Sequence, residues 1–66
     1  MLSYEPLWKT LITKNLKKTD LVINKIISSS TLAKLGKNEP VNSSIYDKIC
    51  TFLNCEIEDI VIHKKN

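Results

Sequence analysis

The sequence predicts a small all-α domain, and three observations lead to that class. The chain has 66 residues with one glycine and two prolines, so few residues interrupt regular structure. Apolar residues recur at helical spacing, and polar residues that commonly cap helices stand between the apolar segments. Because a chain this short buries only about 60% of its unfolded surface, we expect one thin core in a single domain spanning residues 1–66.

The first expected helix begins after Ser3, which can cap it, and ends near Asn15. Pro6 is compatible with the first turn, where its missing N–H has no partner in any case. The inward face is expected to hold the apolar residues of the segment, Leu7, Trp8, Leu11 and Ile12.

Two short helices follow. Thr19 can cap the second, in which Asp20 is favourably placed against the positive end of the helix dipole, and this helix should end near Lys25. Ser28 can cap the third, whose inward residues are Leu32 and Leu35. Asn38 is expected to take the left-handed conformation that ends this helix, with Pro40 as a stop signal beyond it.

Two further helices are expected between residues 43 and 61. Asn42 can cap the fourth, in which Ile45, Ile49 and Leu53 recur every four residues. The fifth covers about 56–61 and opens with acidic residues. The β-branched run at 60–62 also fits a short strand, and residues 62–66 are expected to form a strand or an extended tail.

Charge is unevenly distributed along the chain. Residues 9–37 hold seven lysines against the single Asp20, a net charge of +6, within a total of +3 for the whole chain. A lysine-rich face attracts phosphate chains, although such faces are also ordinary solvated surface. Charge therefore needs a recognisable structural element before it indicates a nucleic-acid partner.

Several function classes find no support in the residues. The longest apolar runs are far too short to cross a membrane, and the N-terminus lacks the pattern of a secretory signal, so we expect a cytoplasmic protein. Cys50 and Cys55 are expected to be reduced thiols. The only histidine, His63, has no partner group for catalysis or metal binding. We therefore expect that the protein is not an enzyme and that it binds no metal, cofactor or small-molecule substrate.

The spacing of the two short helices, at about 19–36, fits a helix-turn-helix. Together, residues 18–21, 27–35 and 45–60 resemble the Cro/C1-type (XRE) helix-turn-helix family, over nearly the whole chain. The resemblance implies a compact five-helix, lambda-repressor-like DNA-binding domain. It is closest to short, single-domain transcription regulators of that family.

The family pattern assigns candidate contacts to double-stranded DNA. Ser29, Ser30 and Lys34 match base-reading positions, with Thr31 between them on the same turn and Ser28 as the cap. Lys18 and Thr19 match positions that anchor to the DNA backbone, and Lys37 and Asn38 match a second set of phosphate or groove contacts. For the serines, capping or solvation is the alternative role. For each lysine, the alternative is plain surface.

Three features depart from the family pattern. Ile26 stands where many members have a glycine in the turn, and a left-handed β-branched residue costs on the order of 1–2 kcal/mol. Apolar Ile23 stands at a position expected to be exposed, as a partner surface or a scattered surface hydrophobe. Gly36 weakens the last turn of the recognition helix by roughly 0.5–1 kcal/mol relative to alanine.

We therefore predict a sequence-specific transcription regulator, a repressor that binds a palindromic operator as a homodimer. The predicted dimer surface consists of the apolar residues after the fourth helix, Ile57, Ile60, Val61 and Ile62. These residues can also serve only to close the core. The alternative function is a protein-interaction module of the same fold, resembling an antitoxin or antirepressor, with DNA binding secondary.

Overall fold

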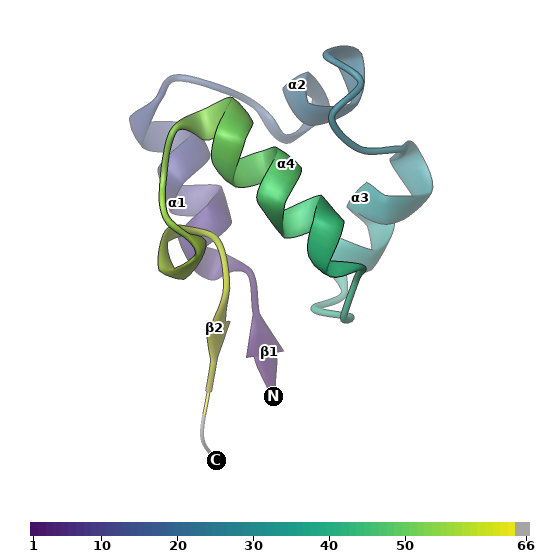
Figure 1. The fold of residues 1–66 in the computed structure, drawn as a ribbon, viewed down its shortest axis with the longest axis vertical. Coiled ribbons are helices and arrows are strands. Elements are labelled where there is room, and N and C mark those ends of the chain that lie inside the picture. The colour runs from purple at the N-terminus through teal and green to yellow at the C-terminus, as the bar shows by residue number, and fades with distance from the viewer. Residues whose placement is uncertain (65–66) are drawn as a thin grey trace.

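The computed structural model describes residues 1–64, which form four α-helices, one 3-10 turn and two short strands. In chain order the elements are β1 (Leu2–Ser3), α1 (Glu5–Thr13), α2 (Lys18–Ile23), α3 (Ser29–Gly36), α4 (Ser43–Leu53), the 3-10 turn η1 (Ile57–Asp59) and β2 (Ile62–His63). Helix α4 crosses the molecule between α1 and α3, and the strands lie together at one end (Figure 1). The predicted all-α class is confirmed. The end of the predicted tail, residues 65–66, lies outside the described residues.

One hydrophobic core joins the four helices to the chain ends. Its buried members are Tyr4, Leu7, Leu11, Leu21, Ile27, Leu35, Ile49, Leu53 and Ile60. Every helix therefore contributes at least one side chain, and the turn before α3 contributes another. Since the core is this small, each contact that fixes α3 to its neighbours carries a large share of the stability.

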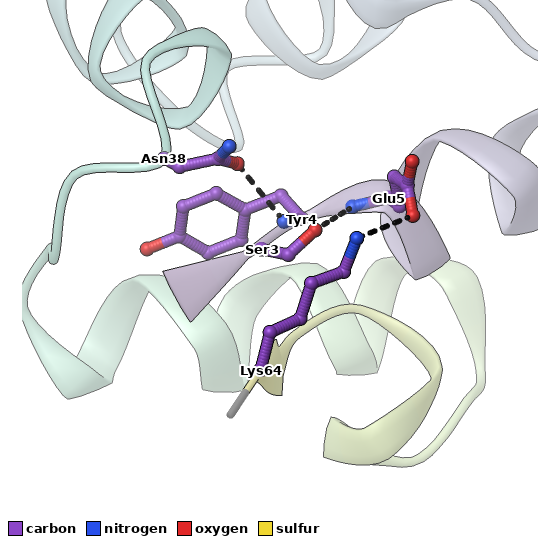
Figure 2. A network of polar contacts seen from close by, with 5 residues as sticks. All are labelled: Ser3, Tyr4, Glu5, Asn38 and Lys64. Atoms are coloured by element: carbon purple, nitrogen blue, oxygen red, sulfur yellow. Dashed lines mark hydrogen bonds and ion pairs between the residues drawn. The ribbon is translucent and has the colours of Figure 1, made fainter. Parts of the chain in front are cut away.

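Helix α1 differs from its expectation at both its start and its inward face. Ser3 belongs to β1 rather than to the helix cap, although its Oγ accepts a hydrogen bond of 3.3 Å from the Glu5 N–H (Figure 2). Leu7 and Leu11 are buried, whereas Ile12 is 76% exposed. Helices turn once in about 3.6 residues, so the residue after Leu11 leaves the core face.

Helix α2 begins one residue before the predicted cap. Thr19 is its second residue, and the side chain that satisfies the helix start is Asp20, whose Oδ2 accepts from the Lys17 N–H at 2.7 Å. The prediction that Thr19 caps the helix is therefore wrong. Asp20 replaces it because a carboxylate in the first turn can reach back to the amide that precedes the helix.

The caps predicted for the next two helices are confirmed. The Ser28 Oγ accepts from the Thr31 N–H at 3.2 Å, and the Asn42 Oδ1 accepts from the Ser44 N–H at 3.1 Å. On α4, Ile49 and Leu53 are buried and Ile45 is half-buried, as the four-residue spacing predicts.

The fifth helix is not present among residues 1–64; a single 3-10 turn, η1, takes its place. Beyond it the chain straightens into β2, which pairs antiparallel with β1, with Ser3 opposite Ile62. The strand alternative for the end of the 60–62 run is thus confirmed. Pairing with β1 supplies hydrogen bonds to the backbone N–H and C=O groups of β2 in place of those that a helix would have supplied.

Candidate nucleic-acid interface

Helices α2 and α3 are joined by a tightly bonded turn at residues 24–28. The N–H groups of Ile26 and Ile27 both donate to the Leu21 carbonyl, at 2.9 and 3.2 Å. Leu21 and Ile27 are buried, so the turn is held from inside by the core as well as by its backbone. This arrangement fixes the orientation of α3 relative to α2.

The left-handed residue of this turn is Lys25, with φ of 59°, and not Ile26. The expectation of strain at Ile26 is therefore wrong. Ile26 is half-buried, and its amide is committed to the Leu21 carbonyl. The left-handed conformation thus falls on exposed Lys25. Its side chain is not branched at Cβ and tolerates this conformation better than a β-branched side chain does.

Hydroxyl groups cluster at the N-terminal end of α3. Besides capping the helix, the Ser28 Oγ lies 3.0 Å from the hydroxyl oxygens of both Ser30 and Thr31. Ser29 and Ser30 are exposed, whereas Thr31 is half-buried and turned toward a hollow beside the turn. The cluster orients short donors and acceptors at the end of the helix that faces solvent.

The outer face of α3 is separate from its core face. The exposed residues Ser29, Ser30, Ala33 and Lys34 follow helical spacing along one side. On the other side, Leu35 is fully buried and Leu32 half-buried. The three residues predicted to read bases, Ser29, Ser30 and Lys34, thus share one solvent-facing surface.

The residues predicted to anchor the DNA backbone lie at the two ends of the α2–α3 unit. Lys18 and Thr19 are exposed in the first turn of α2, and the Lys18 Nζ lies 4.4 Å from the centroid of the Trp8 ring. A cation over an indole face is attracted by about 0.5–1 kcal/mol at exposed sites. Lys18 is therefore held loosely against α1.

Asn38, just past α3, has a structural role that its predicted DNA contact did not include. It is left-handed as predicted, with φ of 56°, and its Oδ1 accepts from the Tyr4 N–H at 3.1 Å (Figure 2). The Tyr4 hydroxyl donates to the Glu39 carbonyl at 2.7 Å. The loop that follows α3 is thereby tied to the start of α1, while neighbouring Lys37 is exposed.

The lysines of the 9–37 segment are all exposed. Within residues 1–64 the only ion pair is between Lys64 and Glu5, at 3.2 Å, which involves none of them (Figure 2). The positive charge around α2 and α3 is thus left available to an anionic partner.

Comparison with known proteins decides the family. The Cro/C1-type HTH DNA-binding domain family matches residues 6–66. The chain belongs to this family. The crystal structure of the transcriptional regulator VanUg, form II, is similar at a TM-score of 0.91 and 43% identity, covering 98% of this chain and 87% of that one. No curated protein matched the chain.

Two lysines beside the helix-turn-helix of this Cro/C1-type domain were not among the candidate DNA contacts assigned from the sequence. Lys25 and Lys48 both line a surface hollow of about 470 Å³ beside the helix-turn-helix turn, together with Thr31. Lys25 could have been found as the exposed residue of the turn. Lys48 could not, because only folding brings the outer face of α4 beside the start of α3.

The predicted dimer surface of the Cro/C1-type domain is only partly at the surface. Ile57 is 50% exposed and Ile62 is 38% exposed, whereas Val61 is half-buried. Ile60 is 1% exposed and packs in the core, which corrects its place in that surface. Its position directly after η1 turns its side chain inward.

Within the described residues 1–64, no helix is long and apolar enough to cross a membrane. The same part of the chain contains no group of three or more histidine, cysteine, aspartate or glutamate side chains arranged to hold a metal ion.

Proposed function

We propose that this Cro/C1-type domain is a sequence-specific transcription regulator that inserts α3 into the major groove of DNA. The outer face of α3 carries the proposal: Ser29, Ser30 and Lys34 point away from a core that holds Leu35 on the opposite side. An α-helix fits the width of the major groove, and small hydroxyls with a lysine can bond base edges there.

The residues divide into two roles. Ser29, Ser30 and Lys34 contact bases, with Ser28 and Thr31 orienting the hydroxyl cluster. The flanking residues contact phosphates and supply mainly affinity; they are Lys18, Thr19, Lys37 and Asn38. Because the chain has no arginine, guanine is read without a bidentate guanidinium.

The active unit is a homodimer that represses from a palindromic operator. One helix of this size covers a few base pairs, so useful specificity requires two recognition helices about 34 Å apart, one turn of the duplex. The exposed apolar side chains of Ile57 and Ile62, with part of Val61, are the proposed contact between copies. The 43% identity to a transcriptional regulator supports the regulatory role.

The proposal is tested by selecting bound fragments from a random DNA pool with the purified chain. A palindrome with half-sites roughly 10 base pairs apart is expected. On that operator, Ser30→Ala and Lys34→Ala should each weaken binding by about 1–3 kcal/mol. Lys9→Ala is the matched control, because Lys9 is an exposed lysine on α1 with no assigned contact. Unchanged affinity for both α3 variants would reject the recognition helix.

A second candidate function is a protein-interaction module in which DNA binding is secondary. Two exposed isoleucines favour it, Ile12 on α1 at 76% and Ile23 at the end of α2 at 71%. Salt separates the two functions, since binding through lysines and phosphates weakens steeply as salt rises, whereas an apolar contact changes little. Ile12→Ser and Ile23→Ser should leave operator affinity unchanged if DNA is the partner.

A further inference from the structure

Cys50 and Cys55 lie side by side at the C-terminal end of α4. After Leu53 the chain turns through Asn54, which is left-handed with φ of 53°, and the Cys55 N–H then donates to the Cys50 carbonyl at 3.1 Å. This type of helix end commonly brings the residue beyond the cap against the last helical turn. Both cysteines are free thiols.

Both cysteines lie at the surface of the molecule, beside a cleft. Each cysteine is half-buried, and both line one surface cleft of about 480 Å³. Tyr46 and the carboxylates of Asp47 and Glu56 also line this cleft. The cysteines thus border the same cleft as a pair while they also pack against the core.

The charges around the pair make the two thiols unequal. Burial raises the pKa of Cys50 to about 11, and Cys55, Asp47 and Glu56 add to the rise. Burial, followed by Asp59, also raises the pKa of Cys55, but hydrogen bonding from Cys50 and the charge of Lys14 on α1 oppose that rise. Groups that oppose the rise in pKa therefore act on Cys55 and not on Cys50.

We propose that Cys50 and Cys55 are a dithiol modification site that closes to an intramolecular disulfide on reaction with small neutral or cationic disulfides. The Cys55 thiolate attacks one sulfur of the reagent, forming a mixed disulfide and expelling one thiolate. Cys50 then loses its proton and attacks the Cys55 sulfur, expelling the second thiolate. The two cysteines lose two protons and two electrons, and the reagent disulfide is reduced to two thiols.

The preference for neutral or cationic reagents follows from the groups that face the pair. Three carboxylates act on the thiols, Asp47 from α4 and Glu56 and Asp59 from the segment that follows it, against one cation, Lys14. An anionic disulfide such as glutathione disulfide is repelled from this cleft, whereas the cationic disulfide cystamine is attracted.

The test exposes the reduced full-length protein, without oxygen, to cystamine or glutathione disulfide and follows the products by acid quenching and mass spectrometry. The expected product has lost two hydrogens and has a Cys50–Cys55 crosslink in its peptide map. Relative to the same protein in urea, native protein should favour cystamine over glutathione disulfide by about three- to tenfold. Accumulation of mixed disulfides or of disulfide-linked dimers in native wild-type protein overturns the site. An equal preference in urea overturns the charge argument.

Single substitutions check the order of attack. Cys50→Ser should react at Cys55 and stop at the mixed disulfide, whereas Cys55→Ser should form its adduct more slowly. Equal adduct rates in the two variants contradict Cys55 as first nucleophile. Glu56→Gln should raise the rate with glutathione disulfide while leaving the final product unchanged. Circular dichroism establishes that each variant is folded. If a variant does not fold, the Cys50–Cys55 crosslink in the wild-type protein still tests the proposed site.

Discussion

Two left-handed residues flank the proposed recognition helix α3, and they reach that conformation in different ways. Lys25 before the helix and Asn38 after it have φ of 59° and 56°. Asparagine adopts this conformation readily, and Asn38 also accepts the Tyr4 N–H through its side chain. Lysine has no such preference, so at Lys25 the neighbouring amides bonded to the Leu21 carbonyl impose the conformation. Local bonding thus overrides residue preference on one side of α3, whereas on the other side the tertiary contact agrees with it.

Asn38→Ala should produce the largest effect on stability. It loses both the left-handed preference and the hydrogen bond from the Tyr4 N–H, so the free energy of unfolding should fall by about 2–3 kcal/mol. Asn38→Gly is the matched control, since it keeps the backbone freedom and loses only the hydrogen bond, at about 1 kcal/mol. Urea unfolding measures both. Equal losses would mean that backbone conformation is not the limiting factor at this position.

Tyr4→Phe should cost about 1–2 kcal/mol, because the hydroxyl that bonds the Glu39 carbonyl and lies 2.8 Å from the Tyr46 hydroxyl is removed. Burial, followed by Tyr46, raises the pKa of Tyr4 above its usual range. The stabilisation by the neutral phenol is therefore complete below the unfolded pKa of about 10 and is lost as pH rises further, through the folded value.

Urea unfolding between pH 7 and pH 11 tests this alkaline loss. Wild type should lose more stability above about pH 10 than Tyr4→Phe does. Parallel pH profiles would show that Tyr4 ionisation does not limit alkaline stability. Tyr46→Phe is a useful control, because it leaves the Tyr4 bond to the Glu39 carbonyl intact.

Lys25→Gly should raise the free energy of unfolding by about 0.5–1 kcal/mol, because glycine adopts a left-handed conformation without side-chain strain. Lys25→Ala removes the same charge but keeps the strain, so it should not stabilise. Thermal unfolding of the two variants separates charge from conformation. Stabilisation by alanine equal to that by glycine would attribute the effect to charge and not to backbone strain.

Gly36→Ala should give the smallest effect, a gain of about 0.5 kcal/mol. Gly36 is the last residue of α3, and a Cβ added there meets no atom within 4 Å beyond its chain neighbours and the backbone of its own helix. Ala33→Gly, at an exposed position of the same helix, is the reverse control and should lose about 0.5–1 kcal/mol. If Gly36→Ala instead lowers the free energy of unfolding, the backbone freedom of glycine at the end of α3 is required to form the loop at Asn38.

Sequence patterns predicted most of α3 because the signals for this helix are local. The cap at Ser28, the inward Leu35 and the left-handed Asn38 all depend on residues within about one or two helical turns. The cap assigned to Thr19 failed because a stronger group, the Asp20 carboxylate, stands beside it. Of the predicted site, the shared outer face of Ser29, Ser30 and Lys34 could be deduced from helical spacing alone.

The sequence by itself determined the helical class, the helix-turn-helix and the residues on the outer face of α3, since apolar spacing and capping act over short distances. Only the tertiary structure decided that η1 replaces a fifth helix, that Ile60 is core, and that Lys25 is the left-handed residue of the turn. The first two features depend on contacts between distant segments, such as β1 with β2, and the third depends on the bonds of the Ile26 and Ile27 amides to the Leu21 carbonyl. Local preferences do not encode such contacts, which form only when the whole chain closes around its core.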